Sequence, residues 1–339
     1  MLSSRRDGFT LSEVMVATAA MGIVLFYVLR TFTTNHQAYV MIDQVSEAQQ
    51  NTRAVASLLE RDIRNAGYMV PAAAAVCGFD SVDAPDILFV SDSDAILPCC
   101  SPPEPTGTAL NRSLSAGNLA AFTSTNPSLG NNSMTVDDVV LDEVPNYDTD
   151  EDGVADSDFQ EGAGAILVDV GNPQRGVACG FVTDVSGTSS ISVDFVSILD
   201  SPGSLPVPED LRLVPAHSYQ VVSVDGIPRL ERDGRILAKD VEDLQFAWYY
   251  DDDRDGQIDG PLEVRGIPGT AYNPSAIDGN DLREVRFNVI SRTRSDDPRN
   301  PDSAGTGQAR ENRDTAIPGD DGRRRRVHTA TVRVRNLSL

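Results

Sequence analysis

The sequence predicts an α+β fold in which one long N-terminal α-helix packs on a mostly antiparallel β-sheet head with long loops. Three observations support this prediction. Residues 9–66 contain no proline and only one glycine, Gly22. Apolar residues recur at helical spacing in the second half of this stretch. Beyond it, short segments alternate apolar and polar residues, as half-buried strands do.

The chain begins with a charged segment, residues 1–8, followed by an apolar run over residues 9–29. As a helix this run would be about 31 Å long, close to the hydrocarbon thickness of a bilayer. Arg5 and Arg6 precede it and predict a cytoplasmic N-terminus. An ordinary signal peptide carries its small-residue cleavage site after the apolar run, whereas here Gly8 precedes it. The pattern predicts a leader and a membrane-spanning first half of the helix.

Residues 30–66 are expected to continue the same helix with one apolar face. Apolar or small residues recur at intervals of three or four, at Met41, Val45, Ala48, Thr52, Val55, Leu59, Ile63 and Ala66. Gly67 is the expected C-cap, because glycine readily adopts the left-handed conformation that ends helices.

Residues 67–339 are expected to form a β-rich globular head in the periplasm. The predicted strands cover residues 86–90, 165–170, 191–198, 219–224, 244–249, 285–291 and 327–334. Two long loops are expected, at residues 98–133 and 296–321, and the sequence assigns no role to either of them.

Composition narrows the classes of function. The formal net charge is −23, which disfavours binding to nucleic acid and favours divalent cations. The sequence contains no nucleophile elbow, HExxH, P-loop or GxGxxG motif, so we do not expect an enzyme.

Four cysteines suggest two disulfides in an oxidising compartment: Cys77, Cys99, Cys100 and Cys179. Because Cys99 and Cys100 are adjacent, each is expected to pair with Cys77 or Cys179 rather than with its neighbour. Free buried thiols are the alternative.

Two acidic segments, DTDEDGVAD and DDDRDGQID, fit the pattern D-x-D-x-D-G-x-x-D. Calcium takes hard oxygen ligands from alternate residues of such loops, and the glycine permits the sharp turn. The expected ligands are Asp148, Asp150, Asp152, Asp156 and the carbonyl of Val154, and then Asp251, Asp253, Asp255, Asp259 and the carbonyl of Gln257. The twelfth position, glutamate in an EF-hand, is Phe159 or Leu262, with Glu161 and Glu263 nearby. Ordinary β-turns on an acidic surface are the alternative.

The segment GFTLSEVMVA resembles the processing site of type IV prepilins and of type II secretion pseudopilins. The resemblance implies cleavage between Gly8 and Phe9 by a prepilin peptidase, followed by N-methylation of Phe9. It also implies that Glu13 pairs with the N-terminal amine of a neighbouring subunit during assembly. A carboxylate within hydrocarbon is costly and usually marks function.

Several later segments resemble minor pilins of the PilW family: LLERDIRNAGY, ILAKDVEDLQFAWYYDDDRDGQID, REVRFNVISRTR and VRVRNL. A type IV pilin-like fold follows from this resemblance. So does a role in priming pilus assembly, with incorporation at the pilus tip. The implied partners are other minor pilins, the major pilin and the inner-membrane assembly platform. The implied location is the inner membrane with the head in the periplasm, and then the pilus at the cell surface.

Two other functions fit the same residues. J-type minor pseudopilins of type II secretion share the general plan. A calcium-dependent adhesion module that uses the pilin helix only as an anchor would use the long loops as its binding surface.

Overall fold

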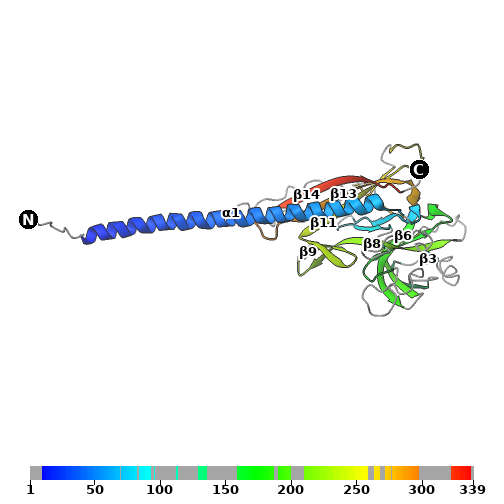
Figure 1. Ribbon diagram of the computed structural model, residues 1–339, viewed down its shortest axis with the longest axis horizontal. Coiled ribbons are helices and arrows are strands. Elements are labelled where there is room, and N and C mark those ends of the chain that lie inside the picture. Colours follow the sequence, from blue (N-terminus) through cyan, green and yellow to red (C-terminus); the bar gives the residue numbers. More distant parts are fainter. Residues whose placement is uncertain are drawn as a thin grey trace, which may run out of the picture. The chain divides into compact units, whose positions relative to one another are not determined.

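The structure is a computed structural model of the whole chain. It describes residues 10–68, 70–81, 84–92, 95, 112–113, 129–135, 159–186, 190–199, 210–258, 263–267, 272–275, 277–297 and 322–336. The chain divides into two compact units, Met1–Glu47 and Ala48–Leu339, and each is described by itself. Figure 1 labels the helices and strands.

Helix α1 spans Leu11–Asn65, as the proline-free stretch predicts. The predicted C-cap is confirmed, because Gly67 has a φ of +80° and its N–H donates to the Ser91 carbonyl at 2.9 Å. The side-chain amide of Asn336 donates to the carbonyl of Asn65 at 2.9 Å. The end of the helix is therefore capped by residues from both ends of the head sequence.

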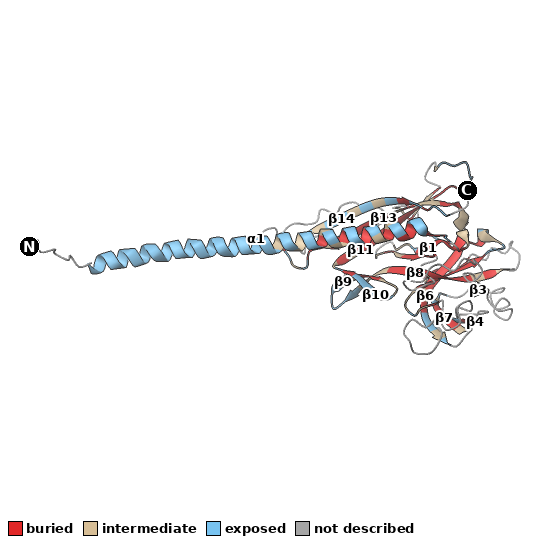
Figure 2. Cartoon of the chain, in the orientation of Figure 1, coloured by how far each residue is buried: buried red, intermediate tan, exposed pale blue. Residues whose placement is uncertain are grey.

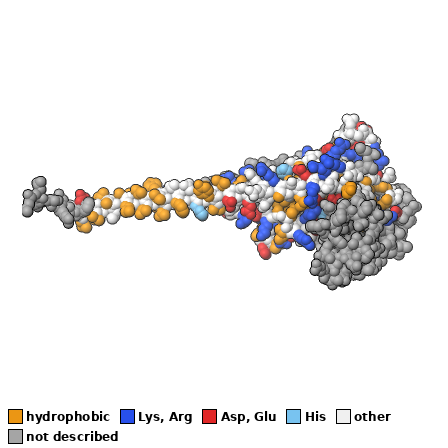
Figure 3. All heavy atoms as spheres, viewed as in Figure 1, with side chains coloured by type: hydrophobic (Ala, Val, Ile, Leu, Met, Phe, Trp, Pro, Cys, Tyr) orange, Lys and Arg blue, Asp and Glu red, His pale blue; other side chains and the backbone are white. Residues whose placement is uncertain are grey.

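Within the first unit, α1 exposes a continuous series of large apolar side chains. Among them are Leu11, Met15, Phe26, Tyr27 and Phe32, each more than 60% exposed. Figure 2 shows this part of the helix as exposed, and Figure 3 shows its hydrophobic side chains. By length and composition the helix can cross a membrane.

The second unit contains a large antiparallel sheet. Its described strands are β1 (Val76–Phe79), β2 (Ile87–Val90), β3 (Arg112–Ser113), β4 (Gly130–Thr135), β5 (Gly164–Asp169), β6 (Val177–Ser186), β7 (Ser190–Phe195), β8 (Leu211–Val224), β9 (Ile227–Arg232) and β10 (Arg235–Lys239). The order is β1-β2-β8-β5-β6-β7-β4, with β3 and β9 also paired to β8, and β10 to β9. The long strand β8 thus joins the two halves of this sheet.

A smaller antiparallel sheet has the order β12-β11-β13-β14. Its strands are β11 (Val241–Tyr250), β12 (Val264–Arg265), β13 (Leu282–Arg292) and β14 (Arg325–Arg333). The described residues of the head also include three 3₁₀ turns. Turn η1 (Ala72–Ala74) lies between α1 and β1, η3 (Pro173–Arg175) between β5 and β6, and η4 (Gly279–Asp281) between β12 and β13.

All seven predicted strands are present, but three predictions need correction. Strand β8 begins at Leu211 rather than near Tyr219. The prediction did not include strands β1, β3, β4, β6, β9, β10 and β12. The segment 98–133 is not entirely loop, because β3 lies within it and β4 begins at Gly130 and pairs with β7. Of the second expected loop, the structure describes Asp296 and Asp297.

The second half of α1 forms the main core of the head together with both sheets. Leu59 and Ile63 are fully buried in one cluster with residues of β2, β8, β11 and β13, including Trp248 and Phe287. Figure 2 shows the buried face of the helix against these strands. The predicted apolar face is confirmed from Ala48 onward. Two further clusters fill the large sheet around Phe89 and around Phe195.

The disulfide joins Cys77 to Cys179. The expectation that each of these cysteines pairs with Cys99 or Cys100 is therefore wrong. Cys77 lies on β1 and Cys179 on β6, which are not neighbours in the sheet. Both nevertheless belong to one buried cluster, in which the sheet brings the two strands together. Cys99 and Cys100 lie outside the described residues.

We expect Leu59→Ala to lower the free energy of unfolding by about 3 kcal/mol, because it leaves a cavity between the helix and the sheets. Leu237→Ala is the matched control. Leu237 is 37% exposed on β10, so its truncation should cost about 0.5 kcal/mol or less. Thermal and denaturant unfolding of the purified protein measure both values. Equal losses in the two variants would contradict the central place of the helix in the core.

Candidate functional site

The proposed processing site lies just before the described residues. Gly8 and Phe9 fall outside them, and Thr10 is the first residue described. Thr10 is the N-cap of α1, and Glu13 occupies the third helical position. The N–H and hydroxyl of Thr10 both donate to Oε2 of Glu13 at 2.9 Å, and the N–H of Glu13 donates to the Thr10 hydroxyl at 3.3 Å.

This reciprocal arrangement is a capping box. It gives Glu13 a local role that the sequence reasoning missed, although the T-x-x-E spacing could have indicated it. Both bonds reach Oε2, and among the described residues none reaches Oε1. The carboxylate is thus fixed at the helix start, with one oxygen available to a donor from another chain.

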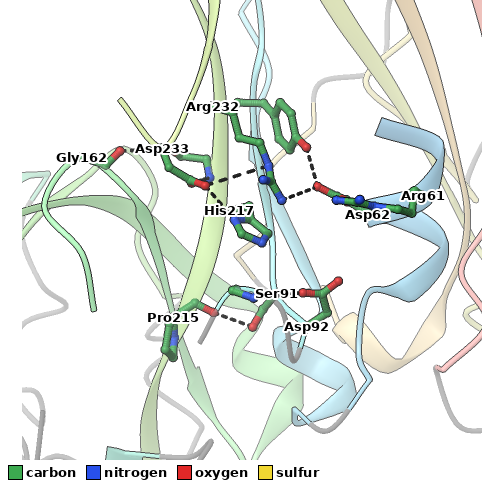
Figure 4. Close-up of polar contacts among 12 residues, drawn as sticks. Arg61, Asp62, Ser91, Asp92, Gly162, Pro215, His217, Arg232 and Asp233 are labelled. Atoms are coloured by element: carbon green, nitrogen blue, oxygen red, sulfur yellow. Dashed lines mark hydrogen bonds and ion pairs between the residues drawn. The ribbon is translucent and has the colours of Figure 1, made fainter. Parts of the chain in front are cut away.

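Helix α1 is joined to the head by a buried polar network around Asp62 (Figure 4). The side chain of Asp62 is 2% exposed. Its Oδ2 accepts hydrogen bonds from the hydroxyl of Tyr219 at 2.5 Å and from the guanidinium of Arg232 at 2.8 Å. Its Oδ1 accepts from Nε of Arg61 at 2.9 Å. The buried charge is therefore paired, as its burial requires.

The network continues along strand β8. Nδ1 of His217 lies 2.7 Å from Oδ2 of Asp233, and the N–H of Ser218 donates to Oδ1 of the same carboxylate at 2.8 Å. The Arg232 guanidinium also lies over the Tyr219 ring at 5.7 Å. Burial raises the pKa of the Tyr219 hydroxyl, and the neighbouring Asp62 adds to this effect. The hydroxyl is therefore a donor at neutral pH.

Asp62 is the second residue that the sequence reasoning missed. Leu59, Asp62 and Ile63 are spaced three and four residues apart, so they share one face of the helix. The sequence signal that could have identified Asp62 is a carboxylate on a helix face that is predicted to be buried.

The second acidic motif lies between β11 and β12. Asp251 follows the last residue of β11 and is 2% exposed. Its Oδ2 accepts from the N–H of Gly256 at 3.2 Å and from Nε of Arg283 at 3.3 Å. Arg254 and Gly256 have positive φ angles of 60° and 86°, which give the loop its tight turn. Residues 251–258 of the motif therefore form a tight turn.

Three carboxylates in this region are close enough to bind one ion: Asp251, Asp253 and Glu263. One ligand atom from each lies within 4.8 Å of the others. Asp253 is exposed, whereas Glu263 is 4% exposed. Glu263 was noted in the sequence only as a nearby residue, and the structure brings it to the group.

Asp255 of the second predicted ligand set is not part of this group. Oδ1 of Asp255 accepts from the N–H of Gln257 at 2.7 Å, which stabilises the turn. Asp259 and the whole first motif, including Asp148, Asp150, Asp152, Val154 and Asp156, lie outside the described residues.

The basic run at residues 323–326 is partly paired within the head. Nε of Arg324 donates to Asp297 at 2.9 Å, and Nε of Arg325 donates to Glu242 at 2.6 Å. Arg326 is exposed on β14. These ion pairs give the run a structural role in attaching the last strand.

Asp86 is a buried carboxyl group with an unusual titration. Its oxygens accept from the N–H groups of Ser81 at 2.9 Å and Phe246 at 2.8 Å. Burial raises its pKa to about 8 despite these bonds, and the neighbouring Asp80 and Asp243 contribute to the rise.

Stability should therefore depend on pH through Asp86. An unfolded aspartate titrates near pH 4, whereas the folded group keeps its proton up to about pH 8. The native state binds the extra proton between these values, so stability should fall as pH rises from 4 to 8, by at most about 1.4 kcal/mol per pH unit. Asp86→Asn should remove this component. Melting temperatures measured from pH 4 to 8 give the result. The exposed Asp194→Asn is the control, and its melting temperature should depend on pH as that of the wild type does, whereas that of Asp86→Asn should not.

No family model and no curated protein matches the chain. Among solved structures, a type IV-like pilin from Thermus thermophilus matches with 12% sequence identity and a TM-score of 0.30. The match covers 86% of this chain and 97% of that chain. The chain itself has the predicted α+β architecture of one long apolar N-terminal helix with antiparallel sheets.

Proposed function

We propose that this chain is a minor pilin of the PilW type, which primes assembly of a type IV pilus and is incorporated at its tip. The observation that carries the proposal is the apolar surface of α1 in the first unit. Large apolar side chains from Leu11 to Ile42 are exposed, and the motif GFTLSE precedes this surface. The proposed role is structural rather than catalytic.

Physical chemistry supports this role. Contiguous apolar surface costs about 25 cal/mol per Å² in water, so a helix of this kind needs a bilayer or neighbouring helices around it. A helix satisfies its own backbone hydrogen bonds and can therefore move from lipid into a filament core without refolding. The same segment could serve first as a membrane anchor and then as the core of a filament.

Glu13 is proposed to set the position of each added subunit. Cleavage between Gly8 and Phe9 would create a new N-terminal amine one residue before Thr10. That amine, on a neighbouring subunit, would be the partner of the Glu13 carboxylate. The pairing offsets the cost of a charge in hydrocarbon and favours one axial register.

The proposed partners follow from this mechanism. A prepilin peptidase would remove residues 1–8 and methylate Phe9. An inner-membrane platform would then insert the helix beside those of other minor pilins and the major pilin. The head would face the periplasm and later the cell surface. Loss of pili on gene deletion would favour a pilin, whereas loss of protein secretion alone would favour a J-type pseudopilin.

Processing is tested by the mass of the chain. When produced with a prepilin peptidase, the wild type should lose residues 1–8 and gain one methyl group on Phe9. Gly8→Val should stay full length, because the resemblance implies a cleavage site that requires a small residue. Intact-protein and peptide mass spectrometry measure both. A wild-type chain that keeps its first residues in cells with an active peptidase would refute the proposal.

Assembly is tested with Glu13→Gln. Glutamine can also form the capping box, so the helix start is retained while the charge is lost. We expect normal processing and at least a tenfold loss of incorporation into filaments, since a buried ion pair that loses a partner costs about 3–5 kcal/mol. Asp43→Asn, an exposed carboxylate on the same helix, is the control. Quantitative immunoblots of sheared filaments measure incorporation. If Glu13→Gln were incorporated as well as the wild type, an ion pair of Glu13 could not set the axial position of the subunit.

A further inference from the structure

We propose that Asp251, Asp253 and Glu263 bind one calcium ion, with Glu263 as a ligand that lies outside the repeated aspartate motif. This inference goes beyond the filament role and does not depend on it. The three side chains are the group of carboxylates whose ligand atoms lie within 4.8 Å of one another.

The sheet fixes the two buried ligands in place. Asp251 follows the end of β11, and Glu263 directly precedes β12. The N–H of Tyr250 donates to the Glu263 carbonyl at 2.8 Å, which continues the ladder between these two strands. The N–H of Asp251 donates to the Asp281 carbonyl at 2.9 Å, next to β13. The antiparallel hairpin therefore brings Glu263, the thirteenth residue of the loop, next to Asp251, the first residue. In an EF-hand the glutamate ligand is the twelfth residue.

An independent observation points to a bound cation. Oδ1 of Asp251 is buried and accepts no hydrogen bond within the part of the chain that the structure describes. The other oxygen of this carboxylate already accepts from Gly256 and Arg283. A buried carboxylate oxygen without a donor is costly, and a metal ion within reach of all three side chains would satisfy it.

The ligand type of the group fits a divalent ion. Asp251, Asp253 and Glu263 carry three negative charges, and the guanidinium of Arg283 lies 3.3 Å from Asp251. Arg254, the nearby cation in the loop, instead contacts Asp278 and Asp281 at 3.2 and 2.8 Å. All three ligand atoms are hard oxygens, and calcium accepts an irregular arrangement of ligands more readily than the strictly octahedral magnesium ion.

The experiment is calcium titration of the full-length protein in detergent micelles, by calorimetry and thermal melting. The parent carries Asp150→Asn and Asp152→Asn, so that the first motif does not contribute heat. Asp253→Asn and Glu263→Gln each remove one charge from the proposed site with little change in shape. Asp252→Asn is the matched control, because it is an exposed carboxylate of the same loop outside the group.

We expect the parent to bind one calcium ion with a rise in melting temperature. Asp253→Asn and Glu263→Gln should each weaken binding at least about tenfold, the loss typical even of an outer-shell partner of a metal. Asp252→Asn should bind as the parent does, and excess magnesium should not compete. All variants should melt cooperatively in a chelator, which shows that they fold.

Two results would overturn the proposal. One is the absence of saturable heat and of a melting shift up to millimolar calcium in the parent. The other is a Glu263→Gln variant that is folded and titrates as the parent does, which would remove Glu263 from the site.

Discussion

The head depends on burial of the second half of α1 between its two sheets. Leu59 and Ile63 are fully buried against β11 and β13, and Asp62 lies on the same face with its charge paired. Burial of apolar side chains supplies the free energy that holds the helix against the sheets, whereas the Asp62 network fixes the position of the helix along them. If the helix shifted by one turn, Asp62 would lose Tyr219 and Arg232 and leave an uncompensated charge in the core. The apolar side chains alone would tolerate such a shift more easily.

The same helix must therefore satisfy two different environments. Its face from Ala48 onward is buried by the head, whereas the apolar side chains of the first unit are exposed along the helix. Both parts are α-helical, so each satisfies its backbone hydrogen bonds internally. The two parts of the helix differ in which of their faces carry apolar side chains. The residues of α1 thus carry an exposed apolar surface in the first unit and a buried apolar face in the second.

The sequence predicts the periodic elements well and the long-range contacts poorly. The helix and strands such as β11 and β13 follow from local spacing. Strand β8 was predicted too short because Pro215 interrupts its pattern. The described pairings explain how this proline is accommodated. On one edge of β8, β3 begins opposite Leu213 and β2 ends opposite His217, so neither strand pairs with Pro215. The missing N–H therefore costs no ladder bond there. The Cys77–Cys179 pairing depends on how the sheet brings β1 and β6 together, which no local pattern reveals.

In the candidate metal site, too, the local pattern could be predicted from the sequence and the long-range contact could not. The site also lies next to the core. The aspartate repeat and Gly256 are local signals, so the loop could be predicted. Glu263 joins the group only because the β11–β12 hairpin returns it to Asp251. Tyr250, the residue before Asp251, belongs to the same buried cluster as Leu59. Ordering of the loop therefore affects the end of β11, a strand against which the helix packs. An ion at Asp251 would stabilise the contact between helix and head, and not merely a surface turn.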